Sequence, residues 1–195
     1  MTRVLIADDE TIIRLDLRTL LETAGYQVVA EAGDGREAVM LSAELGVDLA
    51  VLDIKMPRLD GIEAARQITE NRPIPIVMVT AFGERELVDR AVEAGAYGYL
   101  RKPFRESDLL TAISLAGARF SELMAAREEA SSLASALAAR KVIERAKGLL
   151  MSSEGLSEAD AFQRIRRASQ RSGRSMSAIS EAVVAMLEAE PSKAV

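Results

Sequence analysis

The sequence Val51-Leu52-Asp53-Ile54-Lys55-Met56-Pro57 joins a β-branched apolar run to a loop, with a carboxylate where the run ends. Similar short runs recur before Phe104, separated by helix-length segments whose apolar residues have helical spacing. The five runs cover residues 4–6, 26–29, 49–52, 76–79 and 97–100. This alternation predicts an α/β fold with a doubly wound, five-stranded parallel sheet. The first, third and fourth runs are apolar throughout, so we expect them at its centre.

The composition excludes several kinds of chemistry. The 195 residues include neither cysteine nor histidine, which excludes disulfides, thiolate or imidazole zinc sites and a Ser-His-Asp triad. Carboxylates, lysines and hydroxyls remain, and they suit a hard cation such as Mg²⁺. The apolar stretches are shorter than the ~18 to 20 residues that span a bilayer. Since the N-terminus also lacks a signal-peptide pattern, we expect a cytoplasmic protein with no membrane partner.

Polar side chains follow four of the five predicted strands. They are Asp8 and Asp9 after the first strand, Asp53 at the end of the third, Thr80 at the end of the fourth and Lys102 after the fifth. Ligands of an open parallel sheet bind beyond the carboxyl ends of its strands, so we expect these residues to converge. Clustered carboxylates need a divalent cation to offset their repulsion, and Mg²⁺ beside a lysine suits phosphoryl transfer. We therefore predict that Asp53 is the nucleophile that accepts a phosphoryl group.

Short motifs over about residues 2–119 resemble the receiver domain of two-component response regulators. They are Asp8-Asp9, residues 51–57, Asp60-Gly61, Thr80-Ala81 and Lys102-Pro103-Phe104. The resemblance implies a flavodoxin-like fold in which Asp53 is phosphorylated by a sensor histidine kinase. It also implies that Asp9, Asp53 and the Lys55 backbone carbonyl hold Mg²⁺, with Asp8 acting through water.

The same resemblance gives Thr80 and Tyr99 roles in switching. Thr80 would move toward the phosphoryl group while Tyr99 turns inward; from the pattern alone, Tyr99 is a half-buried strand aromatic. Lys102-Pro103 is expected as a cis peptide, since only X-Pro bonds adopt cis at low cost. Beyond self-phosphorylation and slow dephosphorylation, we expect no enzymatic activity.

After Phe104 the sequence loses its strand pattern and favours one or more long helices. A heptad-like spacing selects Leu109, Ile113, Ala116, Phe120, Leu123, Arg127, Ala130, Ala134 and Leu137. This ladder fits either a dimerising coiled coil or a helix packed within one chain. We assign residues 120–137 to a helical linker and expect a homodimer on phosphorylation.

Residues 138–190 are predicted to form a domain of three helices. Gly155 follows the first helix, a capping box at residues 157–160 opens the second, and Gly173 ends it before a third capped by Ser175 or Ser177. The expected core is Leu149, Leu150, Phe162, Ile165, Ile179, Val183 and Leu187. Ala146 and Gly148 are small enough to let two helices approach closely.

Residues 142–151, 156–162 and 165–169 are similar to the ANTAR domain. With a receiver in front, the chain resembles PdtaR-type transcriptional antitermination regulators, which implies binding to hairpin RNA. Residues 140–174 carry nine basic and four acidic side chains in a chain of net charge −5, which also favours a polyanionic partner.

Fixed cations are the expected RNA contacts, because arginine can bind phosphate and also stack on or hydrogen-bond an unpaired base. The predicted residues are Lys147, Arg166, Arg167, Arg171 and Arg174. With Phe162 assigned to the core, stacking on aromatic side chains is not expected. One alternative is a DNA-binding helix-turn-helix regulator, although double-stranded DNA is less expected than RNA. Another is a helical tail that contacts proteins. The cations can also be read simply as solvated charges.

Overall fold

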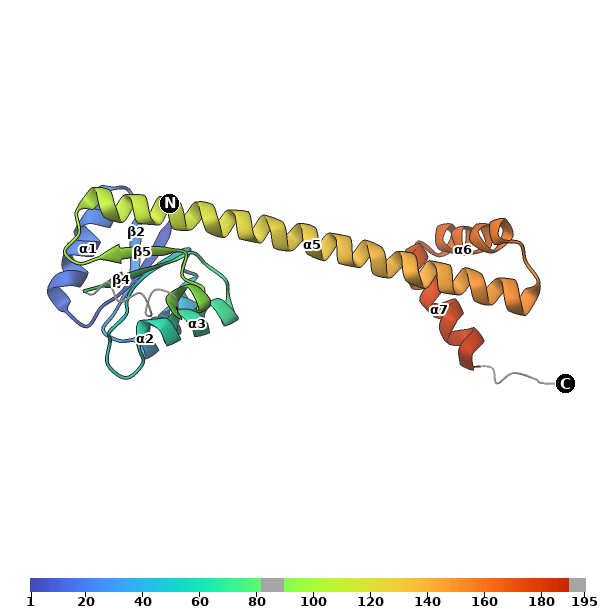
Figure 1. The fold of residues 1–195 in the computed structure, drawn as a ribbon, viewed down its shortest axis with the longest axis horizontal. Helices are drawn as coiled ribbons and strands as arrows, with labels where there is room; N and C mark the ends of the chain where they lie inside the picture. Colours follow the sequence, from blue (N-terminus) through green and yellow to red (C-terminus); the bar gives the residue numbers. More distant parts are fainter. Residues whose placement is uncertain (82–89, 190–195) are drawn as a thin grey trace. The chain divides into compact units, whose positions relative to one another are not determined.

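The computed structural model describes residues 1–81 and 90–189, and the chain divides into two compact units. The N-terminal unit comprises Met1–Met124 and the C-terminal unit comprises Ala125–Val195. Figure 1 shows a sheet flanked by helices in the first unit and helices in the second.

The N-terminal unit contains a parallel sheet of five strands, as predicted. They are β1 (Arg3–Ala7), β2 (Gln27–Ala32), β3 (Leu49–Asp53), β4 (Ile76–Thr80) and β5 (Gly98–Arg101). Their order in the sheet is β2-β1-β3-β4-β5, and every pair of neighbours is parallel. The three uniformly apolar runs form β1, β3 and β4, which lie at the centre. This confirms the flavodoxin-like arrangement.

Helices cover both faces of this sheet (Figure 1). The helices α2 (Gly35–Leu45) and α3 (Gly61–Asn71) supply one apolar core with one face of the strands. On the other face, α1 (Thr11–Thr23) and the first turns of α5 (Glu106–Glu154) supply a second core. Burial on both faces explains why the central strands are apolar throughout.

The heptad-like ladder lies on α5, and its first part packs within one chain rather than forming a coiled coil. Leu109, Ile113 and Ala116 are buried within the N-terminal unit, so this part of the ladder packs inside one chain. Phe120 lies edge-on to Tyr97, with ring centroids 5.5 Å apart. All residues from 121 to 138 are exposed. By length and composition alone, α5 also contains a window apolar enough to cross a membrane, but a single helix of this kind is weak evidence for a membrane span.

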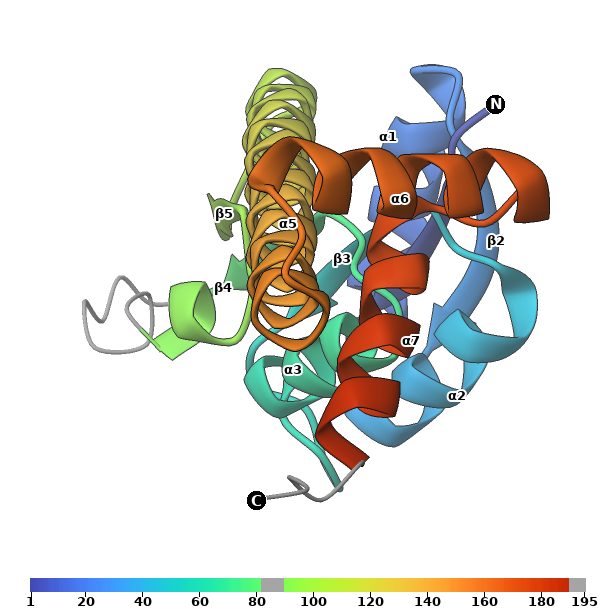
Figure 2. The same ribbon diagram turned by 90° about the vertical axis from the view of Figure 1, so that its right-hand side faces the viewer.

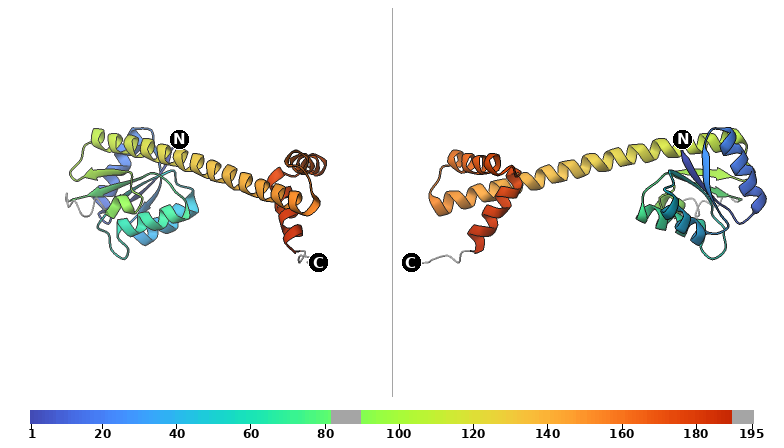
Figure 3. Two further views of the ribbon diagram at one scale, coloured as in Figure 1. Left: turned by 45° about the vertical axis from the view of Figure 1, so that its right-hand side comes forward. Right: turned by 180° about the vertical axis from the view of Figure 1, so that it is seen from behind.

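The C-terminal unit packs the end of α5 with α6 (Glu158–Ser172) and α7 (Met176–Ala189), as Figures 2 and 3 show. Ser157 caps α6 by accepting a hydrogen bond from the Asp160 amide, and Gly173 follows it in the left-handed conformation. The Ser175 hydroxyl accepts from the Ala178 amide at the start of α7. These helix ends match the predictions, although the first predicted helix is the continuation of α5.

The predictions for Phe162 and Gly148 in the C-terminal unit are wrong, and Leu149, also predicted in the core, is half-buried and not part of it. The buried apolar residues are Ala146, Leu150, Ala161 and Ile165, with Ile179, Val183 and Leu187 among those packed around them. Phe162, however, is 39% exposed and is not part of this core, although it directly follows the buried Ala161 in α6. Gly148 is also exposed, and no described atom lies within 4 Å of where its Cβ would be, so it marks no close approach of helices.

Candidate functional site

Three of the predicted site residues lie where β1, β3 and β4 end, at the carboxyl edge of the sheet. The register pairs Ala7 with Leu52 and Asp53 with Val79, so the ends of β1, β3 and β4 are level. Asp8 follows β1, and Asp53 and Thr80 are the last residues of β3 and β4. All three are buried. The topology therefore brings together side chains that are up to 72 positions apart in the sequence.

The ammonium group of Lys102 joins the two buried carboxylates. Its Nζ lies 2.7 Å from Oδ2 of Asp8 and 2.8 Å from Oδ1 of Asp53. Glu10 approaches the same nitrogen at 3.8 Å, although its side chain is largely exposed. Because one cation serves two buried carboxylates, the cluster keeps an excess of negative charge that a further cation would offset.

The pKa values in this cluster follow from burial opposed by pairing. Burial raises the pKa of the Asp53 carboxyl above its ordinary value, while the hydrogen bond and charge of Lys102 partly lower it and the charge of Asp8 raises it. Burial acts to lower the pKa of Lys102, but hydrogen bonds to Asp53 and Asp8 outweigh burial and raise it. Lys102 is therefore a fixed positive charge beside the carboxylate that the sequence singles out.

The loop after β3 holds Asp53 in place. The Lys55 amide donates to Oδ2 of Asp53 at 2.7 Å, and the Gly61 amide donates to the Ile54 carbonyl at 2.9 Å. A Cβ on Gly61 would lie 1.9 Å from the Asp53 carbonyl oxygen. Only glycine fits at this position, which explains the Asp60-Gly61 pair at the start of α3.

A cleft of about 500 Å³ lies beside this loop and contains the remaining predicted metal ligands. Asp9, Lys55 and Pro57 line it, and Asp9 is exposed. No three acidic groups among residues 1–81 and 90–189 form a ready-made metal cluster. The donors nevertheless fit Mg²⁺, which usually keeps several waters and takes only one or two carboxylates.

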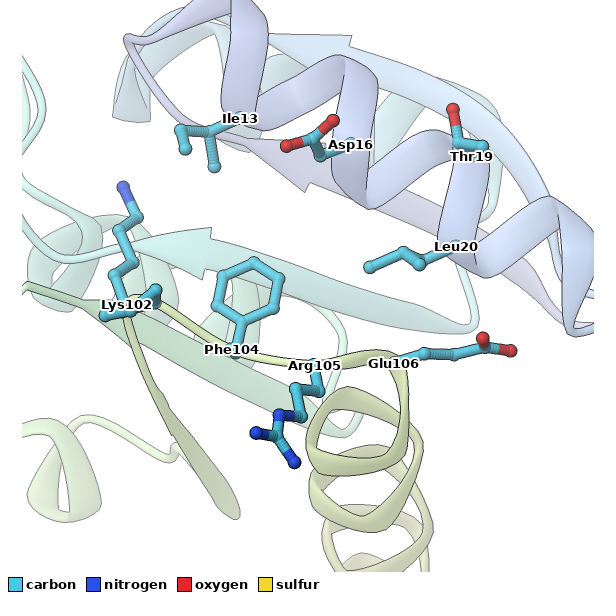
Figure 4. Close-up of a pocket in the computed structure, with 9 residues that line it drawn as sticks. Ile13, Asp16, Thr19, Leu20, Lys102, Phe104, Arg105 and Glu106 are labelled. Atoms are coloured by element: carbon cyan, nitrogen blue, oxygen red, sulfur yellow. The ribbon is translucent and has the colours of Figure 1, made fainter.

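A second cleft, of about 610 Å³, lies between α1 and the segment that joins β5 to α5 (Figure 4). Ile13 and Leu20 of α1 face Phe104 across it, and Lys102 lies at one end. Lys102 thus connects this apolar cleft to the carboxylate cluster. The Lys102-Pro103 peptide bond is cis, as predicted, and Tyr99 is half-buried on β5.

The sequence did not reveal how the loop after β3 is tied to α2. Arg58, whose φ is 64°, forms an ion pair with Asp34, the buried N-cap of α2. The Gly35 amide also donates to the Leu59 carbonyl at 3.2 Å. An Asp-Gly pair before a helix indicates a cap, but nothing in the sequence identifies Arg58 as its partner.

The five predicted RNA contacts in the C-terminal unit fall into two groups. Lys147 is buried, and its Nζ lies 2.7 Å from Glu158 and 2.9 Å from Glu144. Hydrogen bonds to Glu158 and Glu144 raise the pKa of Lys147. This lysine joins α5 to α6, which favours a packing role over phosphate contact. By contrast, the four predicted arginines are exposed and form no ion pair with the carboxylates of the described residues: Arg166, Arg167, Arg171 and Arg174.

Comparison with known proteins identifies both units. The response regulator receiver domain family matches residues 4–114, and the ANTAR domain family matches residues 131–184. The transcriptional regulatory protein PdtaR of Mycobacterium tuberculosis is 50% identical over 185 residues, which cover 95% of this chain and 90% of that protein. The chemotaxis protein CheY of Thermotoga maritima is 39% identical over 113 residues, 57% of this chain and 94% of CheY.

Solved structures match the N-terminal unit. The response regulator domain of Thermotoga maritima CheB aligns with a TM-score of 0.56 and 32% identity, covering 60% of this chain and 97% of that chain. The CheX-CheY-BeF3-Mg²⁺ complex from Borrelia burgdorferi aligns with a TM-score of 0.56 and 30% identity, covering 57% of this chain and 86% of that one.

Proposed function

The chain belongs to the response regulators that combine a receiver domain with an RNA-binding ANTAR domain, and from this we propose that phosphorylation of Asp53 controls hairpin RNA binding and thereby transcription antitermination. One observation carries the proposal for Asp53: Lys102 joins its carboxylate to that of Asp8 at the carboxyl edge of the sheet. We assign residues 2–119 to the receiver, 120–137 to the helical linker and 138–190 to the RNA-binding domain.

Phosphoryl transfer requires Asp53 to act as a nucleophile. A carboxylate oxygen forms a bond to phosphorus, while the bond to the donor group breaks and the donor keeps the electron pair. Lys102 offsets negative charge on the phosphoryl oxygens, and the Lys55 amide orients the carboxylate. Thr80 and Tyr99 are the proposed switch residues that respond to the new phosphoryl group.

Mg²⁺ is the proposed cofactor, held by Asp9, Asp53 and the Lys55 carbonyl, with Asp8 acting through water. When bound, it would neutralise charge on the carboxylates and the transferred phosphoryl group. Asp9→Ala should weaken Mg²⁺ binding, because it removes a direct carboxylate ligand. Unchanged binding in a calorimetric titration, with Asp16→Ala as a control on α1, would contradict this ligand set.

The phosphodonor partner is a sensor histidine kinase, and we propose that it docks beside the α1 cleft. Ile12 and Leu15 of α1 are 75% and 60% exposed, and the neighbouring cleft is largely apolar. Ile12→Ser should slow transfer from the kinase but leave self-phosphorylation from acetyl phosphate unchanged. Equal slowing with both donors would assign Ile12 to the chemistry or to the fold instead.

Hairpin RNA is the proposed ligand of the exposed arginines on α6 and in the loop that follows it. Arginine binds phosphate and unpaired bases, and RNA hairpins offer both. We further propose that the protein is cytoplasmic and has no enzymatic activity beyond self-phosphorylation and slow dephosphorylation. Phosphorylation is proposed to favour a homodimer through the exposed part of α5 at residues 121–138. A gel shift with hairpin RNA and duplex DNA of equal charge tests the ligand, and preference for the duplex would favour a DNA-binding regulator.

A further inference from the structure

The C-terminal unit exposes its only aromatic side chain. Phe162 on α6 is 39% exposed, although the fully buried core beside it contains only Ala146, Leu150, Ala161 and Ile165. A small domain has little apolar surface to bury, so leaving part of a phenylalanine ring in water forgoes some of the available stabilisation. The exposed part of the ring is therefore available to a ligand.

The surroundings of Phe162 are positively charged. Residues 161–175 include five arginines and no acidic residue. Arg166 follows Phe162 by four positions, which places the two on the same side of α6. Glu158 precedes Phe162 by four positions, but its carboxylate is held by Lys147 at 2.7 Å. A ligand at Phe162 therefore meets a cationic surface whose nearest acidic neighbour on this side of α6 is already paired.

We propose that Phe162 is a stacking platform for an unpaired base of hairpin RNA, with Arg166 binding an adjoining phosphate or the same base. This inference rests on the proposed RNA-binding function and adds a specific contact for one nucleotide. Bases in RNA loops can leave the stack and lie on aromatic rings, and arginine neutralises the backbone beside them. A second copy of this face is a poor occupant, because a two-fold contact would bring like charges together.

The chain itself offers a reporter, since it contains no tryptophan. Phe162→Trp introduces one indole that keeps an aromatic face, and Met186→Trp is a matched control at another exposed apolar position, on α7. Both full-length variants are titrated with synthetic hairpins that share one stem and carry a randomised loop, in the presence of Mg²⁺ and beryllofluoride. We expect quenching of the indole at position 162 and no change at position 186.

Affinity gives the second measurement. Phe162→Leu removes the ring but keeps an apolar side chain, and it should weaken hairpin binding about tenfold. The salt dependence should stay as in the wild type, because no charge is lost. Phe162→Tyr should bind like the wild type. Circular dichroism of each variant checks that the helices are intact.

The outcomes separate this inference from the proposed function. Salt-dependent hairpin binding that is equal in wild type and Phe162→Leu, without quenching, overturns the stacking role and leaves RNA binding in place. Failure of the wild type to bind any hairpin overturns both. A Phe162→Leu variant that loses affinity only because it no longer dimerises, as light scattering would show, assigns Phe162 to a protein contact and also overturns the inference.

Discussion

The two units place their functional charges in opposite environments. In the N-terminal unit, the half-buried Lys102 lies within hydrogen-bonding distance of the buried carboxylates of Asp8 and Asp53. In the C-terminal unit, Arg166 and Arg171 are exposed and unpaired among the described residues. A buried cluster suits chemistry on one group, whereas exposed cations suit a large polyanion that brings its own counter-charge. Substitutions should therefore act through chemistry and stability in the first unit, and through salt-dependent binding in the second.

The largest effect is expected at the phosphoacceptor. Asp53→Asn should abolish phosphorylation by acetyl phosphate while the fold is retained, because the amide has nearly the same shape but is a poor nucleophile. Asp16→Asn, an exposed position on α1, is the matched control and should be phosphorylated normally. Mass spectrometry of the intact chain measures the added phosphate. Acid-labile phosphate retained in full by the Asp53→Asn variant would contradict the assignment of Asp53 as the acceptor.

A large loss of stability is expected when Lys102 is removed. Lys102→Met leaves Asp8 and Asp53 buried without their cation, which should lower the free energy of unfolding by about 3 kcal/mol. Adding Asp8→Asn should restore part of that loss, because one uncompensated charge is removed with it. All three tyrosines lie in the N-terminal unit, so tyrosine fluorescence during urea unfolding reports on this unit.

Lys55→Met is the control for that experiment, since Lys55 is exposed on the neighbouring loop. Its free energy of unfolding should stay within about 0.5 kcal/mol of the wild type. An equal loss at both lysines would mean that the Asp8–Lys102–Asp53 cluster has no special role in stability.

Two glycines, one in each unit, test how tightly the backbone is packed around them. Gly61→Ala forces a methyl group against the Asp53 carbonyl and should cost about 2 kcal/mol while slowing phosphorylation. Gly148→Ala, on an exposed part of α5, should stabilise the C-terminal unit by about 0.5 to 1 kcal/mol. Tyrosine fluorescence measures the first change and circular dichroism the second. Destabilisation by Gly148→Ala would restore the close helix contact that the sequence predicted.

The smallest effects distinguish cations within the C-terminal unit. Arg166→Ala and Arg171→Ala should each reduce the slope of log affinity against log salt by about 0.7 to 0.9 for hairpin RNA. Lys147→Met should leave the slope unchanged and lower the melting temperature, because its charge is already paired with Glu144 and Glu158. Gln170→Ala is the uncharged control on α6. A reduced slope for Lys147→Met would return this lysine to the RNA surface.

The fold and site of the N-terminal unit could be predicted because they depend on where residues stand along the strands. Strands that are apolar throughout must be central, and polar residues at their ends must meet at one edge, whatever the side-chain conformations. The contact between Asp34 and Arg58 was missed, since it depends on the left-handed conformation of Arg58 in an irregular loop.

The C-terminal unit was predicted less well because adjacent apolar residues on a helix point in directions about 100° apart, and only one of the two can face the small core. Phe162 lies next to the buried Ala161 in the sequence but outside the core, and an apolar pattern alone did not separate the two. Lys147 has Glu144 three positions before it, which was a visible sign of pairing. Its second partner, Glu158, comes from another helix and could be found only from the structure.

The central claim is that phosphorylation of Asp53 in the N-terminal unit controls the affinity of the exposed arginines in the C-terminal unit for RNA. The decisive measurement is the affinity of the full chain for hairpin RNA with and without beryllofluoride and Mg²⁺, for wild type and Asp53→Asn. Two RNA-binding domains joined in a dimer gain avidity, so we expect beryllofluoride to tighten wild-type binding at least tenfold and to leave Asp53→Asn unchanged. Equal affinity of the wild type in both states, or an equal gain in Asp53→Asn, would contradict the account.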